Sequence, residues 1–157
     1  MERKHRSRWR RKLVLLPLIV IFGMYFLSYT APYPENLGVV DGQLSGLPDT
    51  PNCVSTQTSD TDRKMEPIQI PTGESNMMTR IAEAVKSMPR ARIVKQDSHY
   101  LHAEFTSLIF RFVDDVEFLI DDTERVVHFR SASRVGHSDL GANRRRMTLL
   151  KEKIQNE

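Results

Sequence analysis

The feature that most constrains this chain is an uncharged apolar stretch near its N-terminus. Residues 13–29 (LVLLPLIVIFGMYFLSY) carry no charged side chain. As a helix rising about 1.5 Å per residue, they would extend roughly 26 Å, the short end of what crosses the hydrocarbon core of a bilayer. Trp9 lies before the stretch and Tyr25, Tyr29 and Tyr33 lie at its far end, positions that suit interfacial aromatic side chains. The sequence therefore predicts one transmembrane helix over residues 13–29.

The charges on either side of this stretch predict its orientation. Residues 1–12 contain seven Lys and Arg residues, whereas the next basic residue after the stretch is Arg63. Because basic flanks stay on the cytoplasmic side, residues 1–12 are predicted to form a cytoplasmic tail and the chain after about residue 30 to lie outside. A cleaved signal peptide shares this layout, but bulky Tyr29 and the following Pro32 disfavour cleavage here. An uncleaved, single-pass anchor is the favoured interpretation.

The overall charge of +3 comes from the tail rather than from the rest of the chain. The sequence has 23 Lys and Arg against 20 Asp and Glu. Setting aside the seven basic residues and Glu2 of the tail leaves 16 basic and 19 acidic residues, a net charge of −3 from residue 13 onward. Binding to phosphates without sequence preference needs a basic surface, and only the run 144–146 (RRR) offers one, so we predict no nucleic-acid partner. Cys53 is the only cysteine, which excludes an intramolecular disulfide.

Periodicity and turn signals divide the remainder of the chain. Residues 30–72 hold six of the eight prolines and no persistent apolar period, which is typical of a spacer and irregular arm. Apolar residues three and four positions apart then predict a helix over residues 75–88, capped by Thr72 or Ser75. Strands are predicted over residues 92–96, 100–107, 113–120 and 126–133. A last helix is predicted to begin at Ser138 or Asp139.

Alternation within the strands predicts how the sheet is oriented. Leu101, Ala103 and Phe105 alternate with polar residues, and the next two strands repeat the pattern. Short polar turns join consecutive strands, as in an antiparallel meander with one face toward solvent. The fold class is therefore predicted to be α+β: a small antiparallel β-meander packed by two helices over residues 73–157, preceded by the transmembrane helix.

Two features of the last predicted helix break its pattern. Asn143 falls on the apolar stripe, where a buried amide without partners costs about 1–3 kcal/mol, so we expect it to bond the preceding loop. Arg144, Arg145 and Arg146 follow in the first turns, where the helix dipole disfavours cations. An acidic side chain or a ligand is expected to compensate them.

Three segments carry a family resemblance. HAEFTSLIFRFVDDVEFLID (102–121), RSASRVGHSDLGANRRR (130–146) and PDTPNCVSTQ (48–57) closely resemble the bacterial domain-of-unknown-function 1499 family. The resemblance covers about residues 37–152 and implies an exported or membrane-anchored envelope protein, without supplying a reaction. Together with the predicted anchor, it predicts a location in the bacterial cytoplasmic membrane. Two positions depart from the family pattern. Leu47 stands where members often have a cysteine, and Leu108 stands where many have a basic residue.

The same segments carry the polar residues most suited to a binding site. If the predicted strand 113–120 pairs with the predicted strand 126–133, their charged side chains would lie close to several hydroxyl groups and to the start of the last helix. The candidates are Arg111, Asp114, Asp115, Glu117, Arg130, Ser131, Ser133, Arg134, Asp139 and Asn143. One interpretation is a structural network of ion pairs and hydrogen bonds. The other is a site in which Arg130 and Arg134 grip a carboxylate or phosphate, since guanidinium groups bind such anions with two parallel hydrogen bonds.

Other chemistries have weaker support. His102, Glu104 and His128 could share the polar face and supply a weak metal site, although no close-spaced motif supports one. Ser131 with a histidine and Asp115 could form a catalytic triad only if the geometry allowed it. We predict no cofactor and, as function, a non-enzymatic binding or accessory module for a small anion, a lipid headgroup or an envelope protein. The alternatives are an exported hydrolase or metal-dependent enzyme, and a purely structural partner of a membrane complex.

Overall fold

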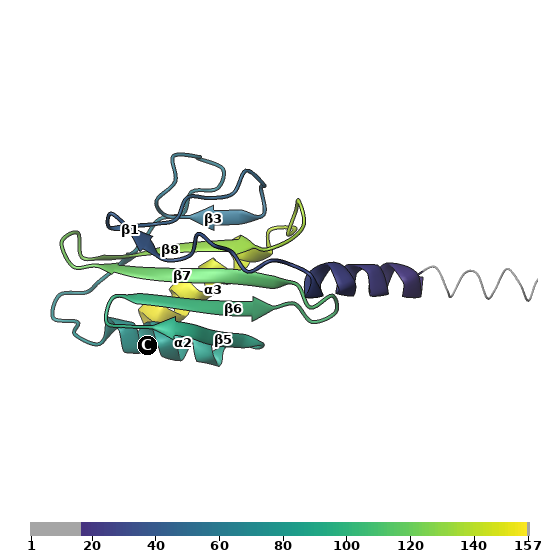
Figure 1. The fold of residues 1–157 in the computed structure, drawn as a ribbon. Helices are drawn as coiled ribbons and strands as arrows, with labels where there is room; N and C mark the ends of the chain where they lie inside the picture. The colour runs from purple at the N-terminus through teal and green to yellow at the C-terminus, as the bar shows by residue number, and fades with distance from the viewer. Residues whose placement is uncertain (1–16, 157) are drawn as a thin grey trace, which may run out of the picture.

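In the computed structural model, residues 17–156 are described, and they form an antiparallel sheet with three helices (Figure 1). Residues 17–29 are helical. The other elements are β1 (Val39–Val40), β2 (Gln43–Leu44), β3 (Cys53–Ser55), β4 (Ile68–Gln69), α2 (Met77–Ser87), β5 (Ala91–Gln96), β6 (Tyr100–Thr106), β7 (Val113–Asp121), β8 (Val126–Ser133) and α3 (Ala142–Asn156). The predicted α+β class is confirmed, and each predicted strand agrees with β5 to β8 within one residue.

The sheet has six strands, and its central part is the predicted meander. The order is β3-β8-β7-β6-β5, with β4 also paired to β8, and every strand pair is antiparallel. Part of the stretch predicted as spacer and arm, residues 30–72, thus contributes β3 and β4 to the sheet. Strands of two or three residues are too short to show a period in sequence, which is why they were not predicted.

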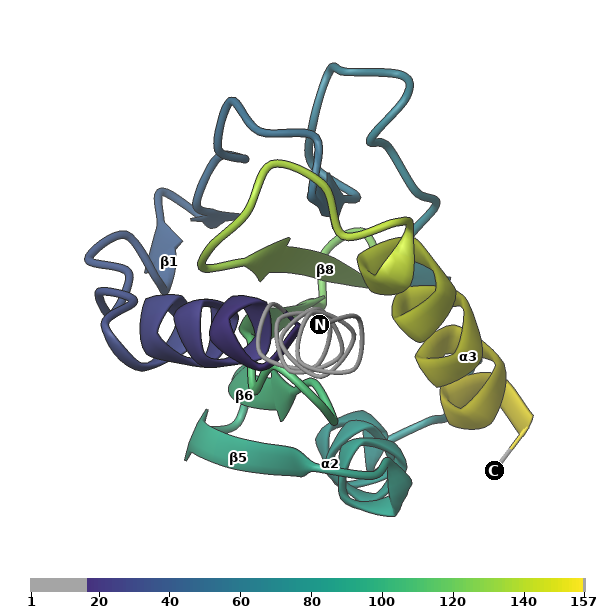
Figure 2. The same ribbon diagram turned by 90° about the vertical axis from the view of Figure 1, so that its right-hand side faces the viewer.

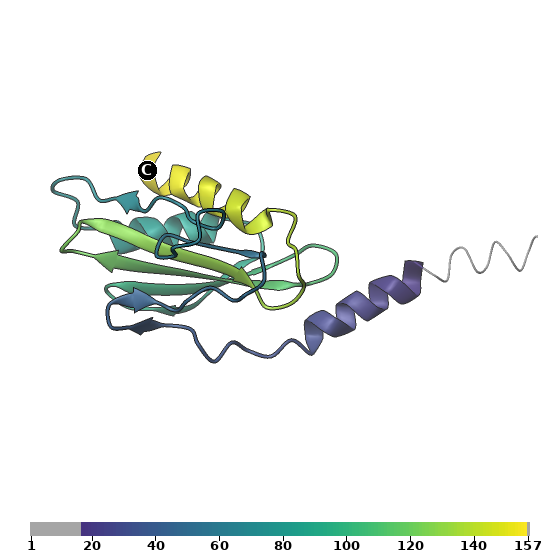
Figure 3. The same cartoon turned by 90° about the horizontal axis from the view of Figure 1, so that it is seen from above.

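The hydrophobic core lies between the sheet and the two helices that follow residue 76. Helices α2 and α3 cover the same face of the sheet, as Figure 3 shows from above. Buried side chains of the strands meet the apolar stripes of both helices there. They include Leu101, Phe105, Phe118, Phe129, Ile81, Val85, Met147, Leu150 and Ile154. Burial of such side chains is the main favourable contribution to folding a domain of this size.

The helix boundaries differ from the predicted ones at their N-termini. Helix α2 follows Asn76, whose side chain makes no cap hydrogen bond. The prediction that Thr72 or Ser75 caps this helix is therefore wrong. The Asn76 amide instead donates to the Glu74 carboxylate at 2.6 Å. Helix α3 begins at Ala142, but the predicted Asp139 does bind its first turn: its carboxylate accepts the Gly141 amide at 2.9 Å and the Asn143 amide at 2.6 Å.

The opposite face of the sheet is covered, which corrects the prediction that it faces water. We call it the polar face because it carries His102, Glu104, Asp115, Glu117 and Arg130, and all five are buried. The covering segment (residues 30–47) runs across it from the end of the N-terminal helix (Figure 3). Leu44 packs there against Tyr100 and Leu119 in a small second core. The segment lacks apolar periodicity, so its role in shielding the sheet could not be predicted from its residues.

The predicted transmembrane helix falls partly outside the described residues. Within residues 17–156, no helix combines the length and the apolar character needed to cross a membrane. Residues 13–16 of the predicted span, and the predicted tail 1–12, lie outside that range. The transmembrane helix therefore stays a prediction.

Candidate functional site

The structure separates the predicted site residues onto the two faces of the sheet. Asp115 and Glu117 of β7, with Arg130 and Arg134 at β8, point to the polar face, where their partners lie. The remaining strand and helix candidates lie on the helix-covered face, namely Asp114, Ser131, Ser133 and Asn143. Arg111 is exposed in the β6–β7 loop and joins neither group. Because successive residues of a strand point to opposite faces, the adjacent polar residues of β7 and β8 are divided between the two faces of the sheet.

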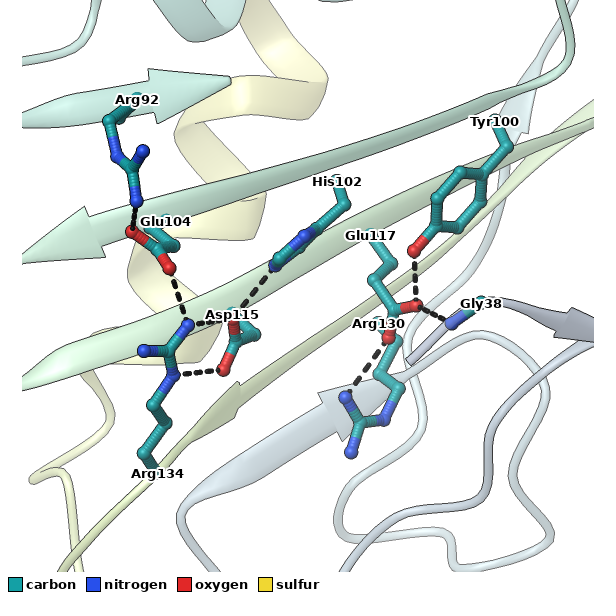
Figure 4. A network of polar contacts seen from close by, with 9 residues as sticks. All are labelled: Gly38, Arg92, Tyr100, His102, Glu104, Asp115, Glu117, Arg130 and Arg134. Carbon is teal, nitrogen blue, oxygen red and sulfur yellow. Dashed lines mark hydrogen bonds and ion pairs between the residues drawn. The ribbon is translucent and has the colours of Figure 1, made fainter. Parts of the chain in front are cut away.

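On the polar face, Arg134 is the centre of a chain of ion pairs (Figure 4). Its Nε and Nη2 donate to both oxygens of Asp115 at 2.8 Å, and its Nη2 also donates to Glu104 at 2.6 Å. His102 Nε2 lies 2.8 Å from Asp115, and Arg92 donates to the second oxygen of Glu104 at 2.6 Å. Both carboxylates are thereby bound by guanidinium donors. Two-point contacts of this kind are among the stronger ion pairs in proteins.

The ionisation of these groups follows from their surroundings. Burial alone would raise the pKa of Asp115, but the hydrogen bonds from Arg134 and His102 outweigh it and lower the pKa. Burial also disfavours the charged form of Glu104, but the hydrogen bonds from Arg92 and Arg134 outweigh it and lower the pKa of Glu104. The hydrogen bond to Asp115 raises the pKa of Arg134 further. All three groups are therefore held charged at neutral pH.

A second buried group lies beside the first, around Glu117 (Figure 4). Glu117 is 0 % exposed, and its Oε1 accepts the Tyr100 hydroxyl and the Gly38 amide, each at 2.7 Å. Its Oε2 accepts Arg130 Nη1 at 3.1 Å. Burial raises the pKa of Tyr100, and the hydrogen bond to Glu117 raises it further, so the phenol stays protonated. One carboxylate thus ties the covering segment to three strands.

The covering segment also closes over the first group. The Arg134 guanidinium lies 4.9 Å from the centre of the Tyr33 ring, and the same ring meets His102 edge to face at 6.2 Å. A cation over an aromatic ring is favourable, and more so where water is excluded. Arg130 and Arg134, predicted as an anion grip, are thus engaged by carboxylates of the chain itself. This arrangement favours the structural-network interpretation of the polar face, and the anion-grip interpretation stays a prediction.

The helix-covered face holds the other half of the predicted site. The Asn143 amide, 0 % exposed, donates to the Asn52 carbonyl at 2.8 Å and to Ser133 Oγ at 3.0 Å. Its oxygen accepts Ser131 Oγ at 2.5 Å and Arg146 at 2.6 Å. The prediction that Asn143 is bonded is confirmed, but its partners are β8 and the segment before β3 rather than the preceding loop. Because Ser131 faces this side, it cannot form a triad with Asp115 and His102.

The three arginines of α3 are compensated differently. Arg146 donates to the Asp114 carboxylate at 2.5 Å and lies over the Phe105 ring, so it has the predicted acidic partner. Arg144 donates to the carbonyls of Asp62 and Lys64, and Arg145 donates to the Leu140 carbonyl at 2.7 Å. Within residues 17–156, these last two have no carboxylate partner.

A pocket of about 320 Å³ opens at the start of α3. Arg63, Arg144 and Arg145 line it together with Asp62 and Asp139. Its floor includes the buried Cys53, whose thiol lies 3.5 Å from Arg63 Nη1 and whose pKa burial raises, so the thiol stays protonated. Arg63 also pairs with Asp60 at 2.7 Å. The sequence run at 144–146 suggested a role for these arginines, whereas nothing in the sequence linked them to Arg63.

The predicted metal ligands are not gathered into one site. His102 binds Asp115, and Glu104 is held by two arginines, while His128 lies on the far side of β7. His128 instead shares the β7–β8 hairpin with Asp121 and Glu124, and one ligand atom from each of the three lies within 4.8 Å of the others. His128 Nδ1 is 3.1 Å from Thr56 Oγ1. These three residues could hold a divalent cation.

Some members of the polar network were not predicted from sequence. Tyr100 could have been, because it alternates with His102 and Glu104 on β6. Tyr33 and Gly38 lie in a segment without period or motif, and Arg92 looked like an ordinary exposed strand residue. Their roles arise only from contacts between segments distant in the sequence.

The fold and this buried network define a class of small α+β domain: an antiparallel meander whose charged face is closed by its own N-terminal segment. A family model described as "Protein of unknown function (DUF1499)" matches residues 43–154. The chain belongs to that family, which confirms the resemblance seen in its sequence. A search of curated proteins found no match, and neither did a search of solved structures.

Proposed function

We propose that this protein is a single-pass envelope protein of the bacterial cytoplasmic membrane whose domain is a non-enzymatic binding module for an anionic group. Its N-terminus lies in the cytoplasm and its domain outside. The observation that carries the binding role is the pair Arg144 and Arg145, which line an open pocket without a carboxylate partner among the described residues. A charged ligand group would supply the compensation that Asp114 supplies to Arg146.

Membrane anchoring has support from the described part of the N-terminal helix. Its apolar side chains are exposed in residues 18–22 and 25–27, and Phe22 is 71 % exposed. A contiguous apolar surface of this kind marks a region that contacts lipid or another protein. The uncharged stretch continues to residue 13, and the basic tail precedes it. Lipid accounts for both the apolar helix and the charge asymmetry.

The pocket suits a phosphate or carboxylate rather than a neutral molecule. Three guanidinium groups line it against two carboxylates. Asp139 is already engaged by the Gly141 and Asn143 amides at the start of α3, and Arg63 is paired with Asp60, so Arg144 and Arg145 are the two arginines left for an anion. Arginine binds such oxyanions through two parallel hydrogen bonds. The donors that Arg144 and Arg145 now direct at backbone carbonyls would turn to the ligand. The same chemistry fits a free phosphate and a lipid headgroup.

The proposal is tested by titrating the full-length protein in detergent with inorganic phosphate and, separately, with glycerol phosphate, followed by calorimetry. The double variant Arg144→Gln, Arg145→Gln should weaken binding by about tenfold or more, because each charge-assisted hydrogen bond contributes about 1.5–3 kcal/mol. The control Lys86→Gln, Lys95→Gln removes the same charge from exposed sites outside the pocket and should bind as the unaltered chain does. Equal loss in both variants, or no binding to the unaltered chain, would refute the pocket as an anion site. Tighter binding of glycerol phosphate would favour a headgroup.

A further inference from the structure

Two loops at one end of the domain display apolar side chains to solvent. In the β6–β7 loop, Leu108 is 70 % exposed and Ile109 is 64 % exposed. In the β8–α3 loop, Leu140 is 84 % exposed. Exposed leucine is common singly, but three such residues on two neighbouring loops form a local apolar surface. Arg134, at the start of the second loop, donates its amide to Val113 at the end of the first, so the bases of the two loops are joined.

The β6–β7 loop is built to hold its tip outward. The Ser107 amide donates to the Phe112 carbonyl at 2.8 Å, and the Phe112 amide donates back to Ser107 Oγ at 2.9 Å. The rings of Phe110 and Phe112 contact each other in a tilted arrangement, with 5.7 Å between their centres. These contacts close the loop at its base, so Leu108 and Ile109 are held away from the hydrophobic core.

The β8–α3 loop displays its leucine in an unfavourable backbone conformation. Leu140 has a φ of 53°, a region that a leucine rarely adopts. Arg145 Nη1 donates to its carbonyl at 2.7 Å, and the Asp139 carboxylate accepts the amide of Gly141. The fold thus holds a strained residue with its side chain in water, where burial against the domain would have been the more favourable outcome.

Both loops lie at the end of the domain from which the N-terminal helix leaves. Figure 1 shows the two loops beside the helix at the same end, and Figure 2 looks onto that end directly. The Ser28 hydroxyl, in the last turn of the helix, donates to the Arg111 carbonyl at 2.6 Å. The β6–β7 loop is therefore joined to the last turn of the helix. Exposed Arg111 lies next to this apolar tip.

We propose that these two loops dock on the outer surface of the bilayer, with Leu108, Ile109 and Leu140 entering its interfacial region. This inference rests on the proposed membrane anchor and adds a second contact to it. The occupant is lipid rather than a protein because the helix that would enter the bilayer is hydrogen-bonded to one loop, and the other loop lies at the same end of the domain. Arg111 would then meet lipid phosphates, as basic side chains do at the edge of an inserted apolar group.

The proposal is tested by spin labelling the full-length protein in vesicles of phosphatidylethanolamine and phosphatidylglycerol. The single variants Leu108→Cys, Ile109→Cys and Leu140→Cys are labelled. The unaltered chain is treated in the same way, to check that the buried Cys53 takes up no label. Collisions with oxygen, which concentrates in lipid, are compared with collisions with a water-soluble nickel chelate. Phe22→Cys reports on the helix, and Val40→Cys reports on the exposed β1 at the opposite end of the domain.

Docking predicts that labels at the three loop positions collide more with oxygen than with nickel, as the label at Phe22 does, and that the label at Val40 shows the reverse. If the label at Phe22 is in lipid but the loop labels are in water, docking is wrong and the anchor stands. If the label at Phe22 is in water, the anchor itself is wrong. Loop labels shielded from both reagents would indicate a protein partner and would overturn docking on lipid.

Discussion

Arg134 illustrates how one side chain can determine the charge state of its neighbours. It neutralises Asp115 and Glu104 in a place from which water is largely excluded. Removing one partner of a buried ion pair costs about 3–5 kcal/mol, because the remaining charge is left without solvent or counterion. Arg92 reaches the same Glu104 from outside, with a side chain that is 70 % exposed. The two arginines thus contact one carboxylate from very different surroundings.

At the residue scale we predict that Arg134→Gln destabilises the protein by about 3–5 kcal/mol at pH 7 and makes its stability less sensitive to acid. The folded-state pKa values of Asp115 and Glu104 are lowered from the ordinary 3.8 and 4.5. The contribution of these two ionised carboxylates to the free energy of unfolding is therefore complete above about pH 5. It is lost as the pH falls through their folded-state pKa values. Without Arg134 the two pKa values are lowered less, because only His102 and Arg92 still donate to the two carboxylates, so the gap between variant and unaltered protein should narrow toward pH 3.

Denaturant unfolding of the full-length protein in detergent at several pH values measures this difference. The matched control is Arg92→Gln, which should cost less than about 1 kcal/mol because its pair is exposed to solvent on one side. A gap between Arg134→Gln and the unaltered protein that stays constant from pH 7 to pH 3 would contradict the assigned role of Arg134.

At the scale of elements, the covering segment is the part of the fold with the weakest local support. Its strands β1 and β2 have two residues each and pair only with one another. It is held to the sheet by side-chain contacts, chiefly Tyr33 on Arg134, Gly38 on Glu117 and Leu44 in the second core. Segments with few buried apolar contacts open at lower free energy than the global unfolding.

We predict that Tyr33→Ala loosens the covering segment without unfolding the sheet. Because Tyr33 is 54 % exposed, loss of the ring should cost about 0.5–1 kcal/mol from its contact with Arg134 and speed amide exchange in residues 30–47 by about two- to fivefold. Hydrogen exchange followed by mass spectrometry measures this, with the strands β6 to β8 as internal reference. Val40→Ala is the control, since Val40 is exposed on β1 and its loss should leave exchange unchanged. Equal exchange in Tyr33→Ala and unaltered protein would show that Tyr33 does not hold the segment.

At the scale of the whole molecule, the N-terminal helix and the domain are connected without a free linker. The helix ends at residue 29, and the covering segment begins at once and is bonded to the sheet by residue 38. Ser28 of the helix and Tyr33 of the segment also contact the domain, through Arg111 and Arg134. That arrangement suits a module that presents one surface, and it supports the proposed docking of the helix-proximal loops.

The proposed orientation predicts the behaviour of reporter fusions. Alkaline phosphatase fused after Glu157 should be active, and a cytoplasmic reporter at the same place should be inactive. Replacing the seven Lys and Arg residues of the tail by Gln removes the charge asymmetry and should lower the phosphatase activity markedly. The control replaces seven exposed basic residues of the domain and should leave activity unchanged. Phosphatase activity that is absent from the unaltered fusion would overturn the proposed topology.

The sequence by itself determined the helices α2 and α3, the strands β5 to β8 and the sides of those strands, but not the short strands β1 to β4. Alternation of Leu101, Ala103 and Phe105 with polar neighbours places β6 correctly, because a strand has a local period of two that any window of residues reveals. The same local logic placed Asp139 at the start of α3 and showed that a buried Asn143 needs partners. The apolar stretch and its basic flank likewise define a membrane prediction from adjacent residues alone.

Only the tertiary structure decided which polar groups meet. The bond from Gly38 to Glu117 joins residues 79 apart in the sequence, and no period or motif relates them. The covering segment turned a predicted wet face into a buried one, so Arg130 and Arg134 became internal partners rather than an open anion grip. Pairing between distant segments depends on reach, burial and competition among partners. Those quantities exist only once the chain has folded.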